Sequence, residues 1–174
     1  MSTAPRLTNF LNLSQTDYRV VKHRHTESAA DSAHAAHVST SRMAKSVLLR
    51  DRKDGHYLIA LTPACNRVDL DWVRDSTTVD PVLAREAELT DVFPDCAMGA
   101  VPGFGQAYQL DVIWDDDLGE QPSVYFEAGD HEELIEIEQD EFHRLFDGFP
   151  HGMISAPSDA YLAYHSYEFW NEAR

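Results

Sequence analysis

Two apolar runs separated by a turn form the clearest pattern along the chain. AKSVLLRD at 44–51 and HYLIALTP at 56–63 are both strongly apolar, and Lys53-Asp54-Gly55 between them is typical of a tight turn. This pattern predicts a central antiparallel hairpin. Further strands are predicted at the segments 18–23, 110–115, 123–129 and 133–138, with a short extended piece around Val82 and Leu83.

The segment ELIEIE at 133–138 mixes apolar with acidic residues. Side chains of a strand alternate between its two faces, so this pattern predicts one buried face and one solvent face. A turn at Gly129-Asp130 is expected to lead into it.

Helices are predicted between these strands. Ser28 can cap a helix through AADSAHAAHV, and Asp69 can start another that runs to Arg74. The remaining helices are expected at 7–14, 86–93 and 141–146, and a C-terminal helix carries the aromatic residues Tyr161, Tyr164, Tyr167, Phe169 and Trp170.

These elements predict a mixed α/β fold: a twisted, barrel-like, mostly antiparallel sheet with helices packed outside. The 174 residues are 43% hydrophobic, which suits one core and therefore a single domain over 1–174. No apolar run is long enough for a membrane helix and the N-terminus lacks a secretory pattern. We expect a soluble, cytoplasmic protein with Cys65 and Cys96 reduced.

The net charge of −16 argues against DNA and other phosphate backbones as partners. The distribution changes this picture, because residues 1–53 hold nine Lys and Arg against four Asp and Glu, which leaves about −21 on the rest. An anionic ligand near the N-terminal third explains this split. The alternative is that the acidic part only maintains solubility.

Lys45 is the first candidate functional residue. It shares strand parity with Val47 and Leu49, so a lysine stands beside apolar side chains on one strand face. Such a lysine can hold an anion or polarise a carbonyl oxygen in a pocket. The alternative is an amine that reaches water at the strand end.

The segment Pro94–Gly105 is the second candidate, because three glycines and two prolines exclude a regular element. Bare backbone groups of such a loop can line a site, although a purely structural turn is the alternative. Its spacing matches neither a dinucleotide fingerprint nor a P-loop. Cys96 beside it has no pattern of an activated thiol.

His131 follows the strand 123–129 and can orient a substrate or move a proton, or it is a plain surface residue. His34 and His37 are three residues apart, but no further zinc-ligand pattern accompanies them, so a solvated helix face is expected. The acidic run 115–117 is also interpreted as solvated. No metal and no cofactor is predicted.

Five segments stand out in this order along the chain: VVKHRHTESAADSAHAAHV, RMAKSVLLR, LIALTPACNRVDL, MGAVPGFG and VYFEAGDHEEL. Through these segments the chain resembles, over residues 18–147, the YbaK and prolyl-tRNA synthetase-associated domain family. It implies an editing core at 18–147, followed by a C-terminal helical extension at 148–174. It also implies metal-independent hydrolysis of the ester between an amino acid and the 3′ end of tRNA.

The resemblance further implies the site residues. Lys45, Gly99 and His131 are the implied catalytic residues. The implied substrate-binding residues are His25, Ala100, Val101, Pro102, Gly103, Phe104, Gly105 and Gly129, and the implied tRNA-binding residues are Lys22, Arg24, Arg42 and Arg50. The family motif GxxxP would place proline at 103, where this chain has glycine after Pro102; this departure predicts a looser or shifted loop.

The leading hypothesis is a trans-editing deacylase that removes a small amino acid such as Ala, Cys or Ser. An aminoacyl-tRNA synthetase is considered as a second partner. One alternative is a non-catalytic module of the same fold that binds tRNA or a synthetase, and another is a protein that binds or hydrolyses a free small molecule. Binding that weakens steeply with salt would identify phosphate contacts.

Overall fold

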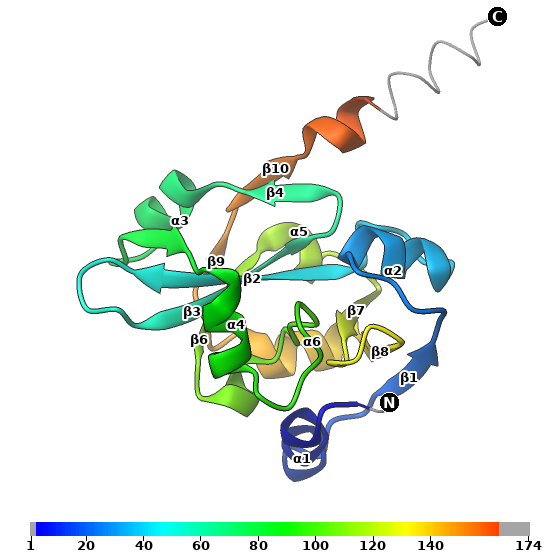
Figure 1. Cartoon of the computed structure of the whole chain (residues 1–174). Coiled ribbons are helices and arrows are strands. Elements are labelled where there is room, and N and C mark those ends of the chain that lie inside the picture. Colours follow the sequence, from blue (N-terminus) through cyan, green and yellow to red (C-terminus); the bar gives the residue numbers. More distant parts are fainter. Residues whose placement is uncertain (1–2, 164–174) are drawn as a thin grey trace, which may run out of the picture.

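The computed structural model describes residues 3–163, and within them the strands form three sheets (Figure 1). The largest has the order β5-β2-β3-β6-β9, the second β1-β8-β7, and β10 pairs with β4. The strands are β1 Arg19–Lys22, β2 Ala44–Asp51, β3 Tyr57–Pro63, β4 Asn66–Val68, β5 Pro81–Leu83, β6 Asp111–Asp115, β7 Ser123–Glu127, β8 Glu133–Glu138, β9 His151–Gly152 and β10 Ser155–Pro157.

The predicted hairpin is confirmed: β2 and β3 pair antiparallel from Ala44↔Pro63 to Arg50↔Tyr57. The pairs β3–β6 and β6–β9 are parallel, and the other strand pairs are antiparallel. A single bridge between Met43 and Tyr125 joins the two larger sheets. The mixed α/β fold is therefore as expected, but the described strands form no closed barrel.

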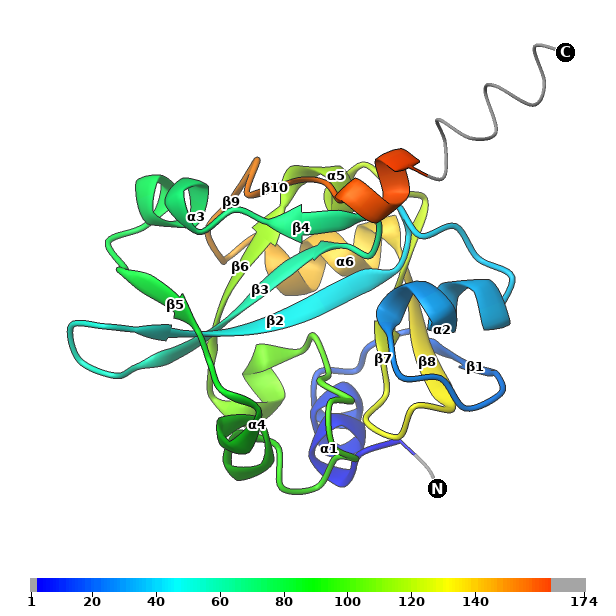
Figure 2. The same cartoon turned by 45° about the horizontal axis from the view of Figure 1, so that its top comes forward.

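Helices surround the sheets, and two of them begin at the cap residues predicted from the sequence. Ser28 Oγ accepts the N–H of Asp31, and Asp69 Oδ1 accepts the N–H groups of Asp71 and Trp72. The helices are α1 Pro5–Leu13, α2 Ala29–Ala35, α3 Leu70–Ser76, α4 Glu86–Val92, α5 Asp116–Gly119 and α6 Gln139–Phe146, with a 3₁₀ turn at Gly105–Tyr108. In Figure 2 α2 lies beside the three-stranded sheet and α3 beside the far end of the five-stranded sheet.

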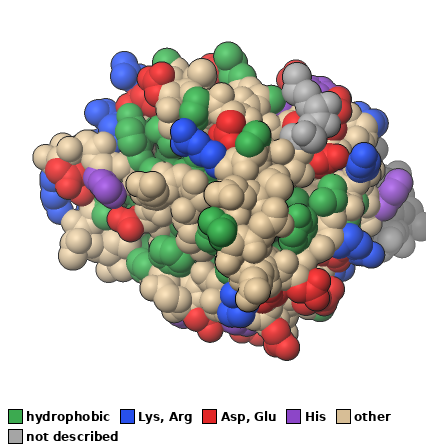
Figure 3. Space-filling view, turned by 90° about the horizontal axis from the view of Figure 1, so that it is seen from below, with side chains coloured by type: hydrophobic (Ala, Val, Ile, Leu, Met, Phe, Trp, Pro, Cys, Tyr) green, Lys and Arg blue, Asp and Glu red, His purple; other side chains and the backbone are tan. Residues whose placement is uncertain are grey.

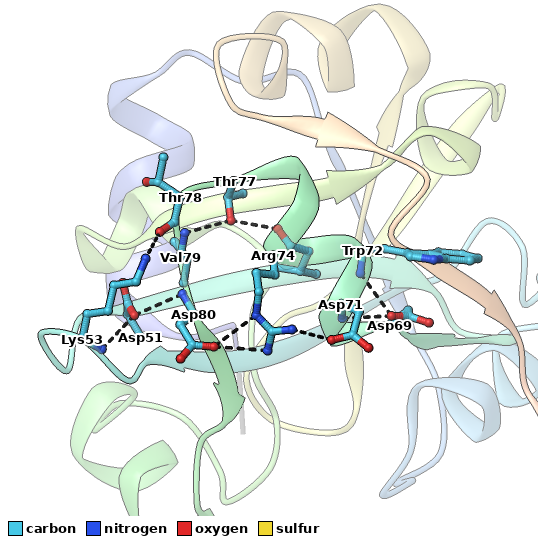
Figure 4. Close-up of polar contacts among 11 residues, drawn as sticks. Asp51, Lys53, Asp69, Asp71, Trp72, Arg74, Thr77, Thr78, Val79 and Asp80 are labelled. Atoms are coloured by element: carbon cyan, nitrogen blue, oxygen red, sulfur yellow. Dashed lines mark hydrogen bonds and ion pairs between the residues drawn. The ribbon is translucent and has the colours of Figure 1, made fainter.

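A polar network fastens β5 to the distal end of the hairpin (Figure 4). Arg74 is paired with both Asp71 and Asp80, and the N–H of Asp80 donates to Asp51 Oδ1 at 3.2 Å. Lys53 Nζ donates to the carbonyl of Thr78 at 2.5 Å. These contacts hold β5 against the last three residues of β2. The first half of β2 is not paired with β5.

The segment 133–138 differs from its prediction, because β8 is the central strand of its sheet and is covered on both faces. Glu136 is only 6% exposed and accepts hydrogen bonds from Tyr125 Oη, Arg19 Nε and Ser123 Oγ. Burial opposes ionisation of Glu136, but these hydrogen bonds outweigh it and hold its pKa below the ordinary value. Glu133 and Glu136 are therefore buried and hydrogen-bonded, whereas Glu138 at the end of β8 is exposed as predicted.

The interpretation of the acidic run as solvated is wrong for Asp115. Its side chain accepts the N–H of Ile154 at 3.1 Å and the hydroxyl of Ser155 at 2.6 Å, and it also caps α5 through the N–H of Asp117. Asp116 and Asp117 are exposed as expected.

The segment after 148 also differs from the expected helical extension. It first contributes β9 and β10 to the sheets, and a helix follows at 159–163. The expected aromatic residues Tyr164, Tyr167, Phe169 and Trp170 lie outside the described residues. Within 3–163, none of the helices combines the length and apolar character that crossing a bilayer requires.

Candidate functional site

A cavity of about 240 Å³ lies where the first half of β2, the glycine loop, the β7–β8 turn and the start of α2 meet. Three predicted residues from distant parts of the chain, Lys45, Gly99 and His131, line it together. The full lining is Glu27, Ser28, Ala29, Met43, Ala44, Lys45, Ser46, Gly99, Val101, Glu127 and His131. With Val101, the fold therefore brings four of the residues that the sequence singled out to one pocket, beside residues that it did not single out.

Lys45 is half-buried on β2 and donates from Nζ to the backbone carbonyl of Asn66. Burial lowers the pKa of Lys45, and the positive charge of Arg67 lowers it further, while Cys65 opposes the shift. Its register partner Thr62 is fully buried, and the Oγ1 of Thr62 has no hydrogen-bond partner in the described part of the chain. The amine is thus drawn into the protein and does not end in bulk water.

Ser46 is a residue that the sequence analysis missed. The N–H of Ala84 donates to the carbonyl of Leu48, so the backbone N–H and C=O groups of Leu48 point away from β3. Alternate residues of a strand point these groups to the same side, so those of Ser46 also point away from β3. No β5 residue pairs with it, since β5 covers only Leu49–Asp51. Its Oγ is buried without a partner among residues 3–163. The alternation of side chains along the strand indicated only that Ser46 lies on the opposite face from Lys45. It does not indicate which edge of the strand is unpaired.

The glycine loop divides into a part at the cavity and a part in the core. Gly99 has φ +82°, a backbone conformation that favours glycine, and it lies beside His131, because a Cβ there would be 3.9 Å from the His131 ring. Val101 lines the same cavity, whereas Ala100 lines a neighbouring apolar cavity of about 240 Å³ beside Phe93 and Cys96.

The second half of the predicted loop site faces inward. Pro102, Gly103, Phe104 and Gly105 are buried and line neither of these two cavities. The Phe104 ring lies 4.5 Å from Phe126 and 5.7 Å from Phe146, centroid to centroid. These residues anchor the loop in the core directly after Gly99 and Val101, which line the cavity.

Gly103 does not loosen the loop as its departure from GxxxP predicted. A Cβ at this position would lie 2.6 Å from Cδ1 of Phe126 and 2.9 Å from Cδ2 of Leu61. Real Cβ atoms do not approach so closely, so glycine is the residue that lets the loop pack on the core.

We therefore expect Gly103→Ala to lower the free energy of unfolding by about 1–3 kcal/mol, the usual cost of overpacking. Urea titration followed by circular dichroism measures the change. Gly148→Ala is the matched control, because nothing lies within 4 Å of its would-be Cβ. Equal stability of the two variants would contradict the tight packing of the loop.

His131 connects the β7–β8 turn to the glycine loop. Its backbone has φ +65°, and Glu127 Oε1 accepts its N–H together with those of Gly129 and Asp130. Its Nε2 lies 2.8 Å from the carbonyl of Met98, and because a carbonyl only accepts, Nε2 carries the proton. In the neutral ring Nδ1 is then the acceptor.

Two further predicted binding residues lie close to this turn. The exposed His25 packs edge-on against His131, with ring centroids 5.3 Å apart. Gly129 has φ +104°, and a Cβ there would meet Ala4 at 2.8 Å, so Gly129 serves the contact with the N-terminal segment and does not line the cavity.

Three of the four predicted tRNA-binding residues are engaged within the protein. Lys22 Nζ lies 3.6 Å from Glu133 Oε1, and Arg50 Nε lies 3.6 Å from Glu88 Oε1. Arg42 donates from Nε to the carbonyl of Ser123, whereas Arg24 is exposed. Figure 3 shows basic side chains dispersed among acidic ones on the face it presents.

The two cysteines are unbridged. Burial raises the pKa of Cys96 to about 11, despite a hydrogen bond with Tyr108 that opposes the shift. The thiol is therefore protonated at neutral pH and lacks the character of a nucleophile. Within residues 3–163, no group of three His, Cys, Asp or Glu side chains is placed to hold a metal ion.

Comparisons with known proteins agree with this architecture. The model of the aminoacyl-tRNA editing domain family matches residues 23–145, which confirms the resemblance found in the sequence. A search of curated protein sequences finds no match.

Solved structures share the fold. A crystal structure of a hypothetical protein superposes with a TM-score of 0.76 at 19% identity and covers 87% of this chain and 99% of its own. A structure described as a candidate trans-editing enzyme for prolyl-tRNA synthetase gives 0.73 at 23% identity, with 88% and 96% covered. A protein from a study of epitope grafting onto scaffolds gives 0.74 at 22% identity, with 89% and 97% covered.

Proposed function

The chain belongs to the aminoacyl-tRNA editing domain family, and from this premise we propose that it hydrolyses the ester bond between a wrongly attached amino acid and the 3′ end of tRNA. The observation that carries the proposal is the convergence of Lys45, Gly99 and His131 on one small cavity. The three residues come from a strand, a glycine loop and a turn, and the fold brings them together.

The residues of the cavity suit hydrolysis of an ester that is already activated. Water placed against the ester carbonyl, with donors aimed at the developing oxyanion, can lower the barrier without a covalent intermediate. Lys45 and the outward-directed N–H of Ser46 supply donors on β2. His131, with Nε2 committed to Met98, has Nδ1 as its acceptor for a water proton.

The cavity volume favours a small amino acid. About 240 Å³ must hold the aminoacyl group and a water, which favours substrates the size of alanine, serine or cysteine. A synthetase built for a larger amino acid rejects smaller ones poorly, because each missing methylene changes the binding free energy by only about 1–3 kcal/mol. A separate hydrolytic site corrects such errors. Arg24, exposed beside His25, is the proposed first contact of the tRNA backbone.

A panel of misacylated tRNAs tests this function. The purified protein is incubated with alanyl-, cysteinyl- and seryl-tRNA, and loss of the radiolabelled amino acid is followed with time. We expect at least one of the three esters to be hydrolysed well above the buffer rate. The Lys45→Ala variant, purified in the same way, measures hydrolysis by contaminating esterases. No hydrolysis of any member above buffer would refute the proposed activity.

A further inference from the structure

A chain of hydrogen bonds runs from the interior of β6 to the amine of Lys45. Asp115 is 1% exposed and accepts the hydroxyl of Ser155 at 2.6 Å. Ser155 Oγ in turn accepts from Nδ2 of Asn66 at 2.9 Å, and the backbone carbonyl of Asn66 accepts from Lys45 Nζ. Four strands, β6, β10, β4 and β2, each contribute one residue to this chain.

The position of β4 depends on the segment that follows the family match. In the described chain β10 is the only strand paired with β4, with Pro157 opposite Asn66. Backbone hydrogen bonds flank this pair, from Ser158 N–H to the carbonyl of Cys65 at 2.9 Å and from Asp69 N–H to the carbonyl of Ile154 at 2.8 Å. The matched family segment ends at 145, so β10 lies beyond it.

We propose that Ser155 and Asp115 are positioning residues that hold Asn66 so that its carbonyl keeps the amine of Lys45 at the cavity. The segment after residue 145 thereby completes the candidate site. The effect of this positioning on catalysis rests on the proposed function. The positioning itself concerns only the geometry of Lys45 and is measurable without any substrate.

The hydroxyl of Ser155 is used both as a donor and as an acceptor, which is the physical reason for expecting tight positioning. Ser155 Oγ donates to Asp115 and accepts from Asn66 at the same time, and both neighbours are buried. Removing the hydroxyl leaves the amide of Asn66 without its partner in a dry environment. The pair β4–β10 is three residues long, and the hydrogen bond from Asn66 to Ser155 adds a side-chain contact between the two strands.

The groups around Lys45 determine the pKa of its amine, which is the quantity that the experiment follows. Cys65 and Arg67 from the β4 side influence its charge, and the cavity adds Glu27, Glu127 and His131. Burial is the largest influence and depresses the pKa of Lys45. If β4 loses its anchor, water reaches the amine and the pKa rises toward the ordinary lysine value.

The experiment measures how modification of Lys45 by an amine-directed acylating reagent depends on pH, by mass spectrometry on the full-length protein. Ser155→Ala is expected to move the midpoint of this profile upward by up to about one unit. Ser155→Thr keeps the hydroxyl and should keep the midpoint. Met153→Ala, an exposed change in the same segment, is the matched control and should not move it.

In the deacylation assay, Ser155→Ala should lower kcat by about ten- to a hundredfold with little change in KM, because a displaced amine weakens the reacting geometry. An unchanged labelling midpoint in folded Ser155→Ala would overturn the inference. If that variant does not fold, Asn66→Ala removes the same hydrogen bond while Ser155 stays bonded to Asp115, and an unchanged midpoint there would overturn it equally. If the wild-type protein hydrolyses no ester, the proposed function fails, but the labelling profile still decides this inference.

Discussion

Replacing Lys45 by alanine is expected to lower kcat for deacylation by about 10²- to 10³-fold, the usual loss when one donor to a developing oxyanion is removed. Among residues 3–163, Lys45 is the only lysine that lines the cavity, and it is partly buried, so its interactions there are stronger than in water. The initial rates of the wild type and the variant on the best substrate of the tRNA panel measure the effect.

Two further variants separate the amine from the packing of its stem. Lys45→Met keeps the length and apolar body of the side chain and should lose activity as Lys45→Ala does. Lys53→Ala removes an exposed lysine in the distal polar network and should retain activity. Wild-type rates in a folded Lys45→Met protein would exclude the amine from the reaction.

Truncation of Phe104 is expected to cost about 3–5 kcal/mol of stability, the range for phenylalanine to alanine in a core. Phe104 is fully buried and packs its ring against Phe10, Phe126 and Phe146. The resemblance implied a substrate contact at this position, whereas the structure places it in the core. Chemical unfolding of Phe104→Ala against the wild type measures the loss.

The matched control is Met98→Ala on the same loop, because Met98 is 67% exposed. This control should leave the free energy of unfolding nearly unchanged. A stable Phe104→Ala protein with a raised KM would show that Phe104 touches substrate and would contradict its assignment to the core.

Local signals predicted the elements well. The turn Lys53-Asp54-Gly55 and its flanking apolar runs correctly predicted the hairpin, and Ser28 and Asp69 correctly predicted two helix starts. Each depends on interactions within a few residues, which the sequence displays directly. The family resemblance was likewise carried by short local motifs and was confirmed over most of its predicted range.

Predictions failed where the environment comes from distant strands. Glu136 resembles a solvent-facing residue in ELIEIE, yet β1 and β7 cover it on either side and supply Arg19 and Tyr125 as partners. Asp115 resembled a solvated acid, yet Ser155, forty residues later, meets it in the interior. A polar residue can be buried when its hydrogen bonds are satisfied, and no local pattern reveals partners so far along the chain.

By itself the sequence determined a mixed α/β fold with a hairpin, a shaped glycine loop and a lysine on a strand, because alternation, caps and turn residues act over short range. It also identified Lys45, Gly99 and His131 as the residues to examine. Only the tertiary structure decided that they share one cavity, that the loop beyond Val101 belongs to the core, and that Ser46 lies on an open strand edge. These outcomes depend on which strands pair and which edge stays uncovered, and strand pairing is a long-range choice that burial of the whole core settles.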